Sequence, residues 1–133
     1  MATSVLRDIS EYHIMVPGIA LHTTSPATYV VSPVSGNLVK VTAVMTVLSD
    51  GDQAVTFEIG GNLVEQNGAT ATLTILNADV LGDVQVLDLT PNATTFLKAA
   101  EDGDAIADGS VIEVLTDAGG SAGAVDFTFT IRP

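Results

Sequence analysis

Residues 125–132 read VDFTFTIR, an unbroken alternation of apolar and polar side chains. Successive side chains of a β-strand point to opposite faces of the sheet, so this period of two predicts a strand with one buried face. The residues expected on the buried face are Val125, Phe127, Phe129 and Ile131. The opposite face meets water or a partner, as in an antiparallel sheet with one open side.

Runs with β character recur upstream, and clusters of Gly, Asp, Asn and Ser separate them. The other candidate strands are 28–32, 38–48, 55–59, 63–64, 70–75, 84–89 and 111–115. One side of the 38–48 run carries Val39, Val41, Ala43, Met45 and Val47. Short strands separated by turn residues predict an all-β fold, an antiparallel β-sandwich or jelly roll of seven to eight strands.

One segment of this β-rich chain has helix signals. Asn92 is a candidate N-cap, the stretch 95–100 is compatible with a helix, and Asp102-Gly103 follows it. Two threonines weaken the pattern, so we expect one short helix or helical turn at most.

Residues 1–26 behave differently from the rest, because they mix apolar and polar positions without a sustained period. Pro17-Gly18 and Ser25-Pro26 act as breakers within them. The segment is either an extended N-terminal arm or an edge strand of the same sandwich. We therefore divide the chain into residues 1–26 and a β-sandwich domain over residues 27–133. The Gly-rich stretch 119–123 is expected to be a flexible loop between the last two strands.

The charge balance excludes several classes of partner. Sixteen acidic and four basic residues give a formal net charge of -12, which repels nucleic acid and anionic lipid alike. The chain has no cysteine, so disulfides, thiolate zinc sites and cysteine nucleophiles are excluded. The first residues lack the pattern of a signal peptide, and no apolar run approaches the roughly 18 residues of a spanning helix. We expect no nucleic-acid or membrane partner.

The acidic segment 101–110 is the best metal candidate, because hard cations take several carboxylate oxygens from one turn. Its candidate ligands are Asp102, Asp104 and Asp108. Counted from Asp102, however, Ile106 stands where an EF-hand loop needs an oxygen ligand and Ala107 where it needs glycine. A calcium site of another geometry that uses Asp50 and Asp52 remains an alternative, although β-turns favour the same residues. We expect no metal and no other cofactor.

No catalytic grouping stands out. Glu11, His13 and His22 are the one acid–base or metal set to consider, and their spacing matches no ligand motif. The chain has no nucleophile elbow and no phosphate-binding glycine loop. It has no tryptophan and only two tyrosines, which disfavours a sugar-stacking cleft. We expect a protein that is not an enzyme.

Four stretches resemble segments of the capsid decoration, or cement, proteins of tailed bacteriophages. They are residues 29–41, an aromatic-led strand with a Pro-x-x-Gly turn and a strand bearing one lysine, together with residues 55–61, 108–114 and 125–131. The resemblance implies a β-sandwich or jelly-roll body, a homotrimer, and attachment to the major capsid protein on the outer surface of an icosahedral head. It implies synthesis in the host cytoplasm and a role in stabilising the capsid lattice of the virion.

Residues 1–26 have no counterpart in that resemblance, which makes them the candidate place for partner-specific contacts. The candidate contact residues are Leu6, Ile9, Tyr12, Ile14 and Met15. Three other functions stay open. They are a head-fibre or tail-tip module that binds a host receptor, a carbohydrate-binding module, and a small β-barrel or cupin-like enzyme.

Overall fold

The structure is a computed structural model that describes residues 11–22, 27–90, 95–100, 109–117 and 120–133. Within these ranges the chain forms β-strands and turns, and no α-helix. The strands are β1 (Tyr12–Ala20), β2 (Thr28–Val31), β3 (Gly36–Val47), β4 (Gln53–Ile59), β5 (Asn62–Leu63), β6 (Glu65–Gln66), β7 (Ala69–Thr70), β8 (Leu73–Ile75), β9 (Val84–Asp88), β10 (Phe96–Leu97), β11 (Val111–Thr116) and β12 (Ala124–Arg132). Four of these segments have only two residues.

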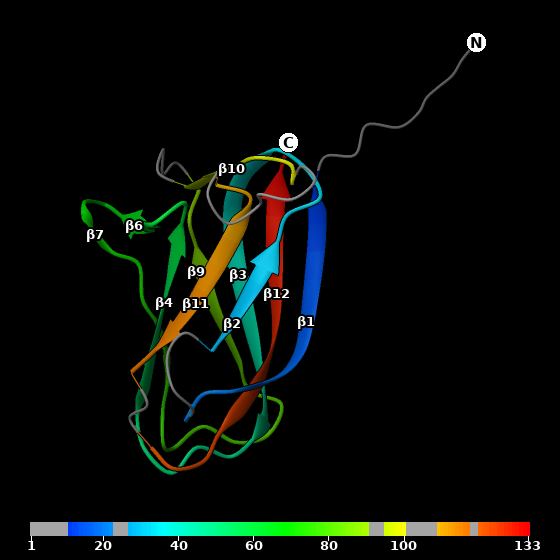
Figure 1. The fold of residues 1–133 in the computed structure, drawn as a ribbon. Helices are drawn as coiled ribbons and strands as arrows, with labels where there is room; N and C mark the ends of the chain where they lie inside the picture. Colours follow the sequence, from blue (N-terminus) through cyan, green and yellow to red (C-terminus); the bar gives the residue numbers. More distant parts are fainter. Residues whose placement is uncertain (1–10, 23–26, 91–94, 101–108, 118–119) are drawn as a thin grey trace.

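Two antiparallel sheets pack against each other as a β-sandwich (Figure 1). The first sheet has the order β1-β12-β3, and both β9 and β10 pair with β3. The second sheet has the order β2-β11-β4, and both β5 and β8 pair with β4. A small separate hairpin joins β6 and β7. The prediction of an all-β antiparallel fold is therefore confirmed.

The eight longer strands pair in a nested order. β1 pairs with β12, β2 with β11, β3 with β9, and β4 with β8, so that strands far apart in sequence enclose those nearer together. Strands β1, β3, β9 and β12 form one layer and β2, β4, β8 and β11 the other. The chain therefore crosses repeatedly from one layer to the other.

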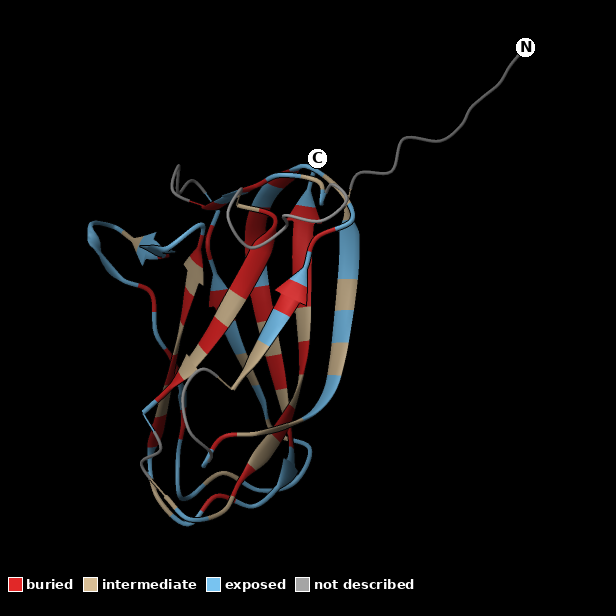
Figure 2. Ribbon diagram, viewed as in Figure 1, coloured by how far each residue is buried: buried red, intermediate tan, exposed pale blue. Residues whose placement is uncertain are grey.

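The core lies between the two sheets, where Figure 2 shows the buried positions of the central strands. Val125, Phe127, Phe129 and Ile131 of β12 are all buried, which confirms the face predicted from their alternation. The ring of Phe57 on β4 meets Phe127 and Phe129 edge-on, with centroids 6.2 and 5.9 Å apart. Aromatic edge-to-face pairs of this kind add to the stabilisation from burial alone.

The described part of residues 1–26 forms an edge strand. β1 pairs with β12 from Tyr12 opposite Ile131 to Ala20 opposite Ala124, with a register shift between Val16 and Ile19. Ile14, Val16 and Ile19 pack against the core. Of the two alternatives left open by the sequence, residues 12–20 adopt the edge strand.

Of the segment expected to form a short helix or helical turn, the structure describes residues 95–100, and the outcome is divided: Thr95 is part of a 3-10 turn, whereas a helix is wrong for the residues that follow it. Phe96 and Leu97 form β10, which pairs with Asn37 and Gly36 of β3. Leu97 is fully buried whereas Phe96 is exposed, so two adjacent side chains face opposite ways, as a strand requires. Burial of the Leu97 side chain in the core therefore outweighs the weak helix signals of this short segment.

Two strand expectations also change in detail. The 70–75 run is divided, because β7 pairs with β6 in the separate hairpin whereas β8 pairs with β4. Val47, expected on the buried side of its run, is half exposed at the end of β3. A register shift between Ala124 and Val125 of the neighbouring β12 lies next to it, so the alternation does not continue to the strand end.

Candidate interaction surface

The side chains of β1, β12, β3 and β9 that point away from the core form a broad surface, here called the outer face, on which Thr130 is buried and the other side chains are exposed or half-buried. Strand register sets its rows. One row holds His13, Thr130, Lys40 and Asp88, a second holds Met15, Thr128, Thr42 and Val86, and a third holds Asp126, Val44 and Val84. The middle of the outer face therefore carries threonine, valine and methionine side chains, and the charged groups lie toward its ends.

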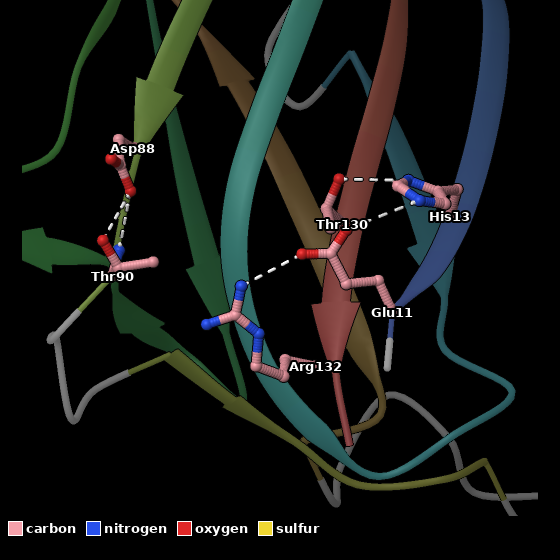
Figure 3. A network of polar contacts seen from close by, with 6 residues as sticks. All are labelled: Glu11, His13, Asp88, Thr90, Thr130 and Arg132. Carbon is pink, nitrogen blue, oxygen red and sulfur yellow. Dashed lines mark hydrogen bonds and ion pairs between the residues drawn. The ribbon is translucent and has the colours of Figure 1, made fainter. Parts of the chain in front are cut away.

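The first row is joined to a network of polar contacts (Figure 3). A guanidinium nitrogen of Arg132 donates to Glu11 Oε2 over 3.0 Å, and Glu11 Oε1 lies 3.8 Å from His13 Nε2. The other ring nitrogen of His13 is 3.2 Å from the hydroxyl of Thr130. These contacts tie Glu11, the residue before β1, and His13 to the C-terminal end of β12.

The two carboxylates of this region are held in their ionised form. The hydrogen bond from Arg132 lowers the pKa of Glu11, and the charge of the same guanidinium adds to the effect. The backbone N–H of Thr90 lowers the pKa of Asp88, helped by the Thr90 hydroxyl, with donor distances of 3.0 and 2.8 Å. Both groups are acceptors in a structural network, which suits a fixed binding surface better than proton transfer.

The acid–base set considered from the sequence is brought together only in part. Glu11 and His13 are neighbours, but His22 follows the other end of β1, where its Nδ1 lies 3.4 Å from the carbonyl oxygen of Gly123. In the described ranges, no three His, Cys, Asp or Glu side chains gather in a way that could hold a metal ion. Asp102, Asp104 and Asp108 lie outside those ranges.

Asp50 and Asp52, the alternative calcium ligands, hold loops together. Asp50 accepts hydrogen bonds from the backbone N–H groups of Ser121 and Ala122, at 2.7 and 3.1 Å, and from the Ser121 hydroxyl. The bonds from Ser121 lower the pKa of Asp50. Asp52 accepts from the backbone N–H of Asn77 over 2.9 Å. Residues 121 and 122 of the Gly-rich loop are therefore hydrogen-bonded to the turn after β3, a contact that the sequence did not predict.

The predicted partner-contact residues fall into three groups. Leu6 and Ile9 lie outside the described residues. Tyr12 and Ile14 share the side of β1 that faces the core, at the sheet edge. Met15 lies on the outer face and is 77% exposed.

Sequence reasoning missed the centre of the outer face. Val84 and Val86 are more than half exposed although they are β-branched and apolar. They alternate with Gln85 and Leu87, so an apolar residue occurs on both sides of β9 and the period of two is hidden. Only the pairing of Val86 with Thr42 places it beside the threonines of β3 and β12.

The two broad sheet surfaces differ in charge. The outer face and its margin hold Lys40 and Arg132, two of the four basic residues of the chain, beside Glu11, Asp88 and Asp126. On the second sheet, by contrast, Glu58 lies directly opposite Glu113 across the β4–β11 pair. The outer face therefore combines acidic and basic side chains, whereas the two facing glutamates of the second sheet have the same charge.

Comparison of the chain with known proteins finds no matching family model, no matching curated protein and no matching solved structure. In the part of the chain that the structure describes, no helix is long and apolar enough to cross a membrane.

Proposed function

We propose that this chain is a virion structural protein, a capsid decoration protein that binds the outer surface of an icosahedral phage head. The observation that carries the proposal is the nested pairing of the eight longer strands. We infer that this order is that of a jelly roll, in which a long hairpin is rolled into two sheets, an architecture common in viral capsid domains. The resemblance of residues 29–41 and 125–131 to decoration proteins points the same way.

The outer face is the surface we assign to the major capsid protein. Its central row of Met15, Thr128, Thr42 and Val86 is uncharged, as the middle of a protein interface usually is. Strand side chains on a paired sheet are already ordered, so binding loses little conformational entropy. Lys40 and Asp88, at the margin, provide charges that set orientation more than affinity.

Many copies of a decoration protein can stabilise a capsid lattice even when each copy binds weakly. A protein that binds the expanded head and not its precursor stabilises it by mass action, by about 2.7 kcal/mol per site at a free concentration of 100 times Kd. The contact of one copy can stay within the size of a weak interface, below about 1,200 Å². A homotrimer, as the resemblance implies, would gain further affinity through the high effective concentration of its linked sites.

The test is to mix the purified protein with purified heads of the phage that encodes it and to image the particles. We expect density at regular lattice positions for the wild-type protein. Val86→Lys, on the outer face, should weaken binding, whereas Leu63→Lys, an exposed apolar position on the second sheet, is the matched control. Binding to host cells but not to heads would favour the receptor-binding alternative. Equal effects of the two substitutions would show that the outer face is not the contact.

A further inference from the structure

β1 has an open edge. It pairs with β12 on one side, and no strand among the described residues pairs with its other side. Figure 1 shows β1 at the outer edge of the first sheet. On an edge strand half of the backbone N–H and C=O groups point outward, and these form a template for a further strand.

The second half of β1 carries devices that block such pairing. Pro17 has no N–H to donate, and the register with β12 shifts between Val16 and Ile19. Gly18 has a positive φ of 67°, and its N–H is used by the side chain of Asp126 over 2.7 Å. Edge strands are commonly protected by proline and bulges of this kind.

The first half of β1, Tyr12–Val16, has none of these devices. Its register with β12 is regular, and it contains neither proline nor lysine. Nor does any carboxylate occur from Tyr12 to Ala20, although the chain has sixteen. Glu11, which precedes Tyr12 in the sequence, is paired with Arg132, and Asp126 contacts the other half of the strand at Gly18. The charge repulsion between two copies of this acidic protein is therefore small along residues 12–16.

We propose that residues 12–16 pair antiparallel with the same residues of a second copy, about a two-fold axis at Ile14. In this register Ile14 lies opposite Ile14 of the second copy, Tyr12 opposite Val16, and His13 opposite Met15. Tyr12, Ile14 and Val16 share one side of the strand, so the pairing covers a strip that one copy leaves partly exposed. No like charges face each other, which a cross-strand pair requires for stability.

The first sheet of one copy then continues into that of the next across an isologous interface. The proposal is independent of capsid binding, and it gives a dimer rather than the trimer that the resemblance implies. A five-residue strand pair is a small interface, below about 1,200 Å², so the association is weak. Mass measurements must therefore extend to protein concentrations of about 1 mM, where complexes of such affinity form.

The first experiment is sedimentation velocity of the full chain over this concentration range. We expect a monomer–dimer equilibrium for the wild type and for Leu63→Lys, an exposed apolar position on β5 that serves as the matched control. Ile14→Lys should raise the dimer dissociation constant by more than about tenfold, because it places two ammonium groups opposite each other. An equimolar mixture of Ile14→Lys with Ile14→Glu should restore the dimer, since the opposite charges then face each other at the two-fold axis.

The second experiment needs no charge in the interface and tests the register directly. The chain contains no cysteine, so Ile14→Cys provides the single thiol of each copy. Directly opposite positions bring Cβ atoms to about 4.5–5.5 Å, close to disulfide geometry. Under mild oxidation Ile14→Cys should form linked dimers faster than Met15→Cys, although Met15 is the more exposed residue.

Several results would overturn the proposal. They are a monomer at every concentration, a trimer, a folded Ile14→Lys variant that associates as the wild type does, and faster cross-linking of Met15→Cys. Loss of association in Leu6→Lys but not in Ile14→Lys would assign the contact to the first ten residues instead. Head binding is measured separately, so a chain that decorates heads as a monomer would refute this inference and leave the proposed function standing.

Discussion

The carboxylate of Asp50 accepts hydrogen bonds from both the backbone N–H and the hydroxyl of Ser121, 71 residues further along the chain. The contact joins the turn after β3 to the loop before β12. Buried Gln53 strengthens the same junction, because its amide donates to Ser49 Oγ over 2.7 Å and to the carbonyl of Ala122 over 2.8 Å. One end of the sandwich is thus closed by side chains that reach across the two sheets.

Asp50→Ala should lower the melting temperature and open the loop at residues 120–123, because the N–H groups of Ser121 and Ala122 lose their acceptor. Limited proteolysis should then cut this loop sooner than in the wild type. Glu58→Ala is the control, since it removes a carboxylate that faces Glu113 on the open side of the second sheet. If both variants melt and cleave alike, the Asp50–Ser121 contact does not close this end.

The stability lost in Asp50→Ala should depend on pH. The hydrogen bonds from Ser121 lower the pKa of Asp50 in the folded protein below 3.8, so the folded state binds fewer protons than the unfolded chain. The contribution of Asp50 is therefore complete above pH 3.8 and is lost as pH falls through the lower folded pKa. Denaturant unfolding of both proteins between neutral pH and pH 2 should show two stability curves that converge at the acid end. A constant separation would contradict the assigned cause.

Gly123→Ala should destabilise the protein more than Gly68→Ala, by at least about 1 kcal/mol, the lower range for overpacking. Both glycines have positive φ, at 125° and 80°, but they differ in the space around them. A Cβ at Gly123 would lie 2.9 Å from Gln53 Nε2 and 3.3 Å from Ser49 Cα, whereas none of the neighbouring atoms lies within 4 Å at Gly68. Equal losses in chemical denaturation would show that backbone conformation alone decides the cost.

Phe127→Ala should cost about 3–5 kcal/mol, because it empties a fully buried site beside Phe57 and Phe129. Phe96→Ala is the matched control, since Phe96 is 54% exposed and should cost less than about 1 kcal/mol. Urea unfolding of both variants measures the difference. A Phe127→Ala loss as small as that of Phe96→Ala would mean that the assigned core face is not tightly packed.

Arg132→Gln should raise the pKa of the Glu11 carboxyl toward its ordinary value of 4.5, because the hydrogen bond from Arg132 is the largest cause of its depression. Carboxyl carbon chemical shifts measured by NMR across the acid range report this pKa directly. The pKa of Asp50 should not move, since its depression comes from Ser121. An unchanged Glu11 in the variant would show that Arg132 does not form this pair in solution.

Strand positions could be predicted from the sequence wherever apolar and polar residues alternate regularly. β12 has the expected buried face because Val125, Phe127, Phe129 and Ile131 alternate with polar residues, which is a property of neighbouring residues. The exposed side of β9 and the existence of β10 could not be predicted from the sequence in the same way. Val84 and Val86 are apolar on the exposed side, and Phe96-Leu97 is too short for a period to appear.

The residues of the outer face illustrate the division between local and distant information. The sequence by itself determined that Phe127 and Phe129 point one way and Thr128 the other, because the pleat of a strand is local. Only the tertiary structure decided that Thr128 lies between Met15 and Thr42, or that Asp50 meets Ser121. Such pairings depend on the strand register and on the loops that bring together segments far apart in the chain. Packing of the whole core sets both, and no short stretch of residues predicts it.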